Sequence, residues 1–105
     1  MSDQKPGAVT YDGTKIPFHE LPLDALEGLC RVLAYGATKY ESGNWRKAND
    51  PTRYLGALYR HLNEHLAGRV IDPESGLPHI EHAVTNMVIL AYVESKRVRI
   101  DPVAQ

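Results

Sequence analysis

Apolar residues recur at helical spacing in three separate stretches of the chain, and each stretch predicts an amphipathic helix. The first helix begins near Pro22, because proline suits the first helical position. Asp24 then lies in the first turn, where the helix dipole favours an acid, and a turn at residues 41–44 follows the helix. Cys30 belongs to the apolar stripe and is expected to be buried and unreactive. The stripe consists of Leu23, Leu26, Leu29, Cys30, Leu33 and Ala37.

A polar loop at residues 69–78 separates a second and a third helix. Asp50 is expected to cap the second helix, with Pro51 at its first position and Gly68 at its end. The third helix is predicted from about residue 77 to residue 96, with cations at its C-terminal end. The second helix is expected to bury Tyr54, Leu55, Leu58, His61, Leu62, His65 and Leu66. The third carries its apolar stripe at Ile80, Ala83, Val84, Met87, Val88 and Ala91.

Together these helices predict an all-α fold, a three- to four-helix bundle with an extended N-terminal arm. The arm covers residues 1–14, which are rich in polar residues, glycine and proline and are expected to be flexible. Residues 15–97 are predicted to form a single all-α domain, and residues 98–105 a C-terminal tail.

Composition places the chain among ordinary globular proteins and limits the classes of partner that it is expected to bind. A chain of 105 residues forms one domain with a thin core, for which association of subunits is a common remedy. The 12 Lys and Arg residues against 13 Asp and Glu residues argue against a nucleic-acid binder. No apolar run is long enough to span a membrane and no secretory signal is visible, so we expect a cytoplasmic protein. The single cysteine excludes a disulfide framework within the chain.

Four of the five histidines lie between positions 61 and 82. His61 and His65 share one face of the second helix, and His79 and His82 share one face of the third. If these helices pack antiparallel, both pairs converge at one end of the bundle, beside the acidic loop at residues 72–76. Imidazole with carboxylate suits Zn, Mn, Fe or Ni, whereas Mg prefers oxygen ligands. The same histidines are also compatible with a purely structural role in the core or at a subunit interface.

A second candidate region lies at residues 39–47, where cations alternate with the aromatic residues Tyr40 and Trp45. Such a segment can stack a base on an aromatic ring and hold phosphates with Lys or Arg. The alternative is that Trp45 fills a gap between helices and that the charged side chains are solvated.

Several strings in the chain together form a recognisable pattern. They are Gly13-Thr14-Lys15-x-Pro17-Phe18, Leu21-Pro22-x-x-Ala25-Leu26, Tyr35-Gly36-Ala37-x-Lys39-Tyr40, Asn44-Trp45, Ala57-x-x-Arg60-His61 and Asp72-Pro73-Glu74-Ser75-Gly76-Leu77-Pro78-His79-x-x-His82-Ala83. With these strings the chain resembles the N-terminal family of phage-associated dATP/dGTP diphosphohydrolases. More distantly, it is similar to MazG-like all-α nucleotide pyrophosphohydrolases. The resemblance extends from about residue 11 to residue 95.

The resemblance implies a homodimer or homotetramer that works in the cytoplasm of an infected bacterial host. It implies cleavage of purine deoxynucleoside triphosphates to monophosphate and pyrophosphate, with a divalent metal, Mg or Mn. Carried onto this chain, it implies catalytic roles for Arg60, His61 and Glu74 and metal binding by His61, Asp72, His79 and His82. The resemblance also implies substrate binding by Lys15, Lys39, Tyr40, Asn44, Trp45 and Arg60.

One departure from the pattern leaves other functions open. MazG-type enzymes hold Mg through E-x-x-E on one helix and E-x-x-D on another, and neither string occurs here. The metal would then be held by a His/Asp set or by fewer carboxylates. Alternatively, the protein binds a nucleotide or a cyclic-nucleotide signal without cleaving it, or it is a structural bundle.

Overall fold

The computed structural model describes residues 15–97, and these residues form an all-α fold. The predicted arm at residues 1–14 and tail at residues 98–105 lie outside the described residues. No helix in the described part is long and apolar enough to cross a membrane. The elements are the short 3-10 helix η2 (Phe18–Glu20), α1 (Leu23–Lys39), the 3-10 helix η3 (Asn44–Lys47), α2 (Pro51–Leu66) and α3 (His79–Arg97).

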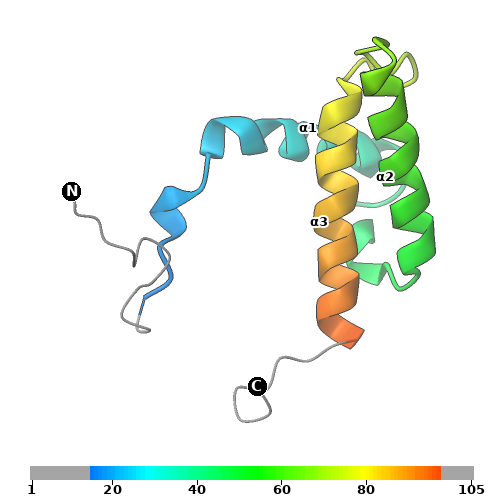
Figure 1. Ribbon diagram of the computed structural model, residues 1–105. Helices are drawn as coiled ribbons and strands as arrows, with labels where there is room; N and C mark the ends of the chain where they lie inside the picture. The colour runs from blue at the N-terminus through cyan, green and yellow to red at the C-terminus, as the bar shows by residue number, and fades with distance from the viewer. Residues whose placement is uncertain (1–14, 98–105) are drawn as a thin grey trace, which may run out of the picture.

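Helices α2 and α3 lie side by side and antiparallel, as the sequence led us to expect (Figure 1). The start of α2 matches its predicted cap, because the carboxylate of Asp50 accepts a hydrogen bond from the backbone N–H of Thr52 at 3.1 Å. The loop between the helices is closed by a β-bridge between Ile71 and Pro78. Gly76 in this loop has φ +76°, which favours glycine. The closed loop brings the end of α2 next to the start of α3.

Helix α1 passes behind the α2–α3 pair, while its first turns and η2 project away from the pair (Figure 1). The crossing with α3 occurs at Gly28, where an added Cβ would lie 2.4 Å from the side-chain carboxyl carbon of Glu81. Arg31 forms an ion pair with the same carboxylate at 3.1 Å. A side chain at position 28 would therefore require the Glu81 side chain, held by Arg31, to shift.

The core is small and lies toward the C-terminal end of α3. Ala48, Ile89 and Val93 are buried together, and Leu33, Trp45 and Tyr54 pack against them. The segment that contains η3 is fixed to α3 by the Tyr92 hydroxyl, which donates to the carbonyl of Arg46 at 3.2 Å. The ammonium of Lys96 also donates to the carbonyl of Ala48, at 2.7 Å.

Apolar positions on all three α-helices differ from the sequence-based expectation. Cys30, expected to be buried, is exposed, because the buried residues of α1 are instead Gly28 and Val32. Leu55 and Leu66, expected in the buried stripe of α2, are also exposed. The stripe of α3 is turned outward except for Ala83, since the inner face of that helix is occupied by a largely polar set: His79, His82, Thr85, Asn86, Ile89 and Val93.

Candidate functional site

A cavity of about 700 Å³ lies between α1, the segment around η3, α2 and the first half of α3. It brings together ten of the eleven residues predicted for the site, from four separate parts of the chain. Lys15 is the exception, because it is exposed in the projecting N-terminal segment and does not line the cavity. The ten are Lys39, Tyr40, Asn44, Trp45, Arg60, His61, Asp72, Glu74, His79 and His82.

Three histidines meet at one wall of the cavity. The Nδ1 atoms of His61 and His79 lie 2.8 Å apart, and the rings of His61 and His82 stack at a centroid distance of 4.4 Å. Burial, together with the proximity of His82 and Arg60, lowers the pKa of His61 to about 4. Burial also lowers the pKa of His82, although Asp72 acts in the opposite direction. His61 and His82 are therefore neutral at pH 7.

The loop before α3 holds Asp72 and Ser75 against His82. The Ser75 hydroxyl lies 2.9 Å from an Asp72 carboxylate oxygen and 2.7 Å from Nε2 of His82. It also accepts a hydrogen bond from the N–H of Leu77 at 3.2 Å. Burial acts to raise the pKa of Asp72, but hydrogen bonds from Ser75 and from the backbone of Glu74 outweigh it, so that pKa is lowered. Asp72 is thus a carboxylate with its charge already partly compensated.

Glu74 bridges the same loop to the end of α1. Its carboxylate lies 3.1 Å from the ammonium of Lys39, and both side chains line the cavity. Hydrogen bonds from Lys39 and then from Tyr35 lower the pKa of Glu74, while Glu74 raises the pKa of Lys39. Both groups are exposed, so the pair can exchange partners with a charged ligand at little cost.

The opposite end of the cavity is aromatic. Trp45 meets the Tyr92 ring edge-on at 5.1 Å, and the Arg46 guanidinium lies over the Trp45 ring at 4.5 Å. Trp45 and Tyr54 both line the cavity and also pack against the core. Trp45 therefore packs between the helices beside the core, as the structural alternative predicted, and it also faces the cavity.

The predicted metal ligands do not form a ready-made metal site. Within residues 15–97, no group of three or more His, Cys, Asp or Glu side chains is arranged to hold an ion. His61 and His79 direct their Nδ1 atoms at each other rather than toward a common point. The carboxylates of Asp72 and Glu74 both line the cavity and are oxygen donors of the kind that Mg prefers.

Several further residues line the cavity that sequence reasoning did not select. Glu64, one turn after Arg60 on α2, is held by Arg69 through two hydrogen bonds of 2.7 and 3.1 Å. The amide nitrogen of Asn86 donates to the carbonyl of His82 at 2.8 Å. Glu64 lies one helical turn from Arg60, a spacing that would have identified it, whereas Asn86 was already recognisable as continuing the helix face of His79 and His82. The full set also includes Tyr35, Arg53, Tyr54 and Thr85.

Comparison with known proteins found one matching family model and one similar curated protein. The family model described as "dATP/dGTP diphosphohydrolase, N-terminal" matches residues 5–103. A protein of Salmonella phage PMBT28 named dATP/dGTP diphosphohydrolase is 30% identical over 89 residues, which cover 85% of this chain and 30% of that protein. The chain thus spans about a third of the length of this curated relative. No solved structure matches the chain.

Proposed function

This chain belongs to the dATP/dGTP diphosphohydrolase N-terminal family. From that premise we propose that it binds a purine deoxynucleoside triphosphate in the cavity and cleaves it to the monophosphate and pyrophosphate. The observation that carries the proposal is the cavity itself, which gathers cations, acids, neutral histidines and aromatic rings around one space. A pocket with charged groups at one end and apolar walls at the other suits a nucleotide.

The charged end of the cavity suits a triphosphate. The guanidinium of Arg60 lines the cavity, and among the described residues it forms no ion pair within 4.0 Å. A planar guanidinium can bind two phosphate oxygens at once. Lys39 adds a second cation, which would exchange Glu74 for a phosphate oxygen when the substrate binds. In this proposal Lys39 and Arg60 hold the phosphates, while Tyr40, Asn44 and Trp45 contact the base and sugar.

The release of Glu74 from Lys39 provides a group for the reaction. A water molecule attacks the α-phosphorus, its oxygen bonds to that atom, and pyrophosphate leaves with the electron pair of the broken P–O bond. Glu74, or the neutral ring of His61, accepts the proton from the water. Most of the rate enhancement would come from positioning and from charge stabilisation by Arg60 and Lys39.

We further propose that Mg or Mn enters together with the triphosphate. Mg is usually bound through one or two carboxylates plus substrate phosphates rather than by a complete protein cage. Asp72 and Glu74 provide such carboxylates at the cavity wall, with His61, His79 and His82 behind them. The ion would neutralise phosphate charge.

The proposal extends to the oligomeric state of the protein and to its location in the cell. We propose that the protein works as a homodimer or homotetramer, since the core of one chain is small. We also propose that it acts in the cytoplasm of an infected cell, where deoxynucleotides are made, as the phage origin of its relative suggests.

The direct test is incubation of the protein with each of the four deoxynucleoside triphosphates, with Mg, with Mn or with a chelator, and separation of the products by ion exchange. We expect monophosphate and pyrophosphate from dATP or dGTP, and no product after chelation. The matched pair Arg60→Gln and Arg97→Gln separates site from fold, because Arg97 forms an ion pair with Glu94 and neither residue lines the cavity. Release of phosphate in place of pyrophosphate, or no cleavage of any nucleotide, contradicts the proposed reaction.

Binding without cleavage is the second candidate, and one observation favours it. Three carboxylates that line the cavity are engaged by other side chains: Glu74 by Lys39, Glu64 by Arg69 and Asp72 by Ser75. Such a site would retain a nucleotide or a cyclic-nucleotide signal. Recovery of the intact ligand after heat release of the complex supports this function, and recovery of cleavage products excludes it.

A further inference from the structure

A smaller cavity of about 160 Å³, termed the side cavity, adjoins the aromatic end of the main cavity. Asn44, Arg53 and Tyr54 line both cavities, so the two spaces meet at these three side chains, termed the junction. The rest of the side cavity is lined by residues 47–50. Pockets for small molecules begin at roughly 300 Å³, so the side cavity suits one edge of a larger ligand better than a ligand of its own.

Arg53 is the cation at the junction, and its charge is not compensated by a carboxylate. Its guanidinium lies 6.0 Å from the centroid of the Tyr54 ring. Among the described residues it forms no ion pair, whereas Arg31, Arg69 and Arg97 each form one. A guanidinium has five N–H donors and no acceptor. Arg53 can therefore bind only the acceptor atoms of a ligand that reaches the junction.

The spacing of two arginines on α2 places Arg53 at the base of a bound nucleotide. Arg53 and Arg60 are seven residues apart, two helical turns, so about 10 Å separates them along one face of the helix. The base and the outer phosphates of a nucleoside triphosphate are separated by a comparable distance. With the phosphates at Arg60, as proposed above, the base lies between the rings of Trp45 and Tyr54 and its edge reaches the junction.

Arg53 distinguishes the two common purines because they differ at one edge of the ring. Guanine presents two acceptors there, O6 and N7, whereas adenine presents the N7 acceptor beside the N6 amino donor. Arg53 can donate to both atoms of guanine, but at adenine it would oppose one N–H to another. Asn44 carries both a donor and an acceptor, so it is compatible with either base.

We propose that the junction binds this edge of the base and that Arg53, by donating to O6 and N7, makes the site selective for 6-oxopurines. The inference rests on the proposed function and defines its substrates more closely. They are the deoxynucleoside triphosphates of guanine and of hypoxanthine, with dATP as a weaker ligand. Hypoxanthine has the same O6 and N7 as guanine and lacks only the 2-amino group, so Arg53 binds it through the same two contacts.

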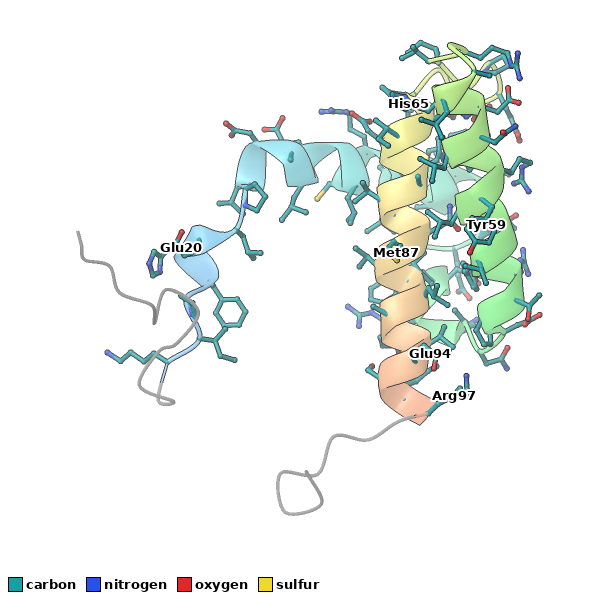
Figure 2. The ribbon with its side chains drawn as sticks, viewed as in Figure 1. Glu20, Tyr59, His65, Met87, Glu94 and Arg97 are labelled. Atoms are coloured by element: carbon teal, nitrogen blue, oxygen red, sulfur yellow. The ribbon has the colours of Figure 1, made fainter. Side chains whose placement is uncertain are left out.

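The first experiment compares three arginine variants by calorimetric titration with non-hydrolysable analogues of dGTP, deoxyinosine triphosphate and dATP. We expect the parent to bind the two 6-oxopurine analogues about 10-fold more tightly than the dATP analogue. R53Q should weaken those two alone and so abolish the preference, whereas R60Q should weaken all three by a similar factor. The control is R97Q, since Arg97 pairs with Glu94 at the C-terminal end of α3 and lines neither cavity (Figure 2).

The outcomes separate this inference from the proposed function. Equal binding of the three analogues by the parent overturns the selectivity, and an equal loss for all three in R53Q places Arg53 at the phosphates. Either result overturns the inference while triphosphate binding, and with it the proposed function, stands. A parent that binds none of the analogues contradicts the proposed function as well.

The second experiment changes the ligand and therefore does not depend on a variant that folds. In the 7-deaza analogue of dGTP a C–H group replaces N7, which removes one acceptor from the edge that faces Arg53. The parent should bind this analogue about 5-fold more weakly than the dGTP analogue, through the loss of one charge-assisted hydrogen bond. R53Q should bind the two with equal affinity. Equal affinities in the parent, or the same 5-fold loss in R53Q, overturn the contact between Arg53 and N7.

Discussion

The Nδ1 atoms of His61 and His79 face each other at 2.8 Å across the α2–α3 pair. Two imidazoles can share this contact only if one donates its proton and the other accepts, so the two rings carry opposite tautomers. A proton on the accepting Nδ1 would place two N–H groups in opposition. Together with burial, which lowers the pKa of His61 to about 4, this contact keeps His61 neutral in the folded protein at pH 7.

Stability is therefore expected to fall in mild acid. In the unfolded chain His61 takes up a proton near its ordinary pKa of 6.5, whereas in the fold it does so only near pH 4. The unfolded state binds more protons between these values, so the free energy of unfolding decreases as pH falls from 6.5 to 4. Because the ring is only half-buried, we expect a loss of about 1 to 2 kcal/mol. The measurement is urea denaturation at a series of pH values.

The variants H61Q and H19Q isolate this contribution. His19 is exposed in η2, far from the cluster, and H19Q should keep the pH dependence of the parent. H61Q should have a shallower dependence between pH 6.5 and 4, even if its stability at pH 7 is lower. An unchanged slope in H61Q would mean that the contact with His79 does not oppose protonation.

Ser75 is expected to hold the acidic loop against α3. Its hydroxyl contacts Asp72, His82 and the N–H of Leu77 within 3.2 Å, and S75A removes one hydrogen-bond partner from a nearly buried carboxylate and imidazole. We expect a loss of about 1 to 3 kcal/mol in the free energy of unfolding. The control is S95A, since Ser95 makes one exposed hydrogen bond, to the carbonyl of Tyr92. Equal stability of the two variants in denaturant titration would contradict the role of Ser75.

The helices could be predicted from the sequence because local signals determine them. The capping carboxylate of Asp50, Pro51 after it and the periodicity of the third helix all depend on residues close together in the chain. The convergence of His61, Asp72, His79 and His82 on one wall also followed from the short loop between two helices.

Periodicity alone could not predict which face of α3 is buried within the chain. The apolar stripe that includes Met87 is the stronger signal, yet the helix directs His82 and Asn86 inward and Met87 outward. A sequence pattern shows that a helix has two faces, but not which face packs within the chain and which packs against another molecule. For the same reason the exposure of Cys30 and Leu66 was missed.

Lys39 is expected to contribute to phosphate binding and not to the fold. K39Q removes one exposed ion pair, with Glu74, so stability should change by less than about 1 kcal/mol. Loss of one charge-assisted phosphate contact should weaken binding of a triphosphate about 10-fold or more. The control K47Q removes the exposed Lys47–Glu41 pair, and Lys47 does not line the cavity. Calorimetric titration with a non-hydrolysable dATP analogue gives both affinities, and equal affinities would place the phosphates elsewhere.

The crossing of α1 over α3 can be tested with two glycines of the same helix. At Gly28 an added Cβ would lie 2.4 Å from the Glu81 side chain, whereas at Gly36 nothing lies within 4 Å. G28A must displace Glu81 or separate the two helices, at an expected cost of about 1 to 3 kcal/mol. G36A introduces only the better helix former and should stabilise the protein by roughly 0.5 to 1 kcal/mol. Because α1 forms one wall of the cavity, G28A should also weaken nucleotide binding. The opposite order of stabilities in urea denaturation would show that α1 does not pack on α3 through Gly28.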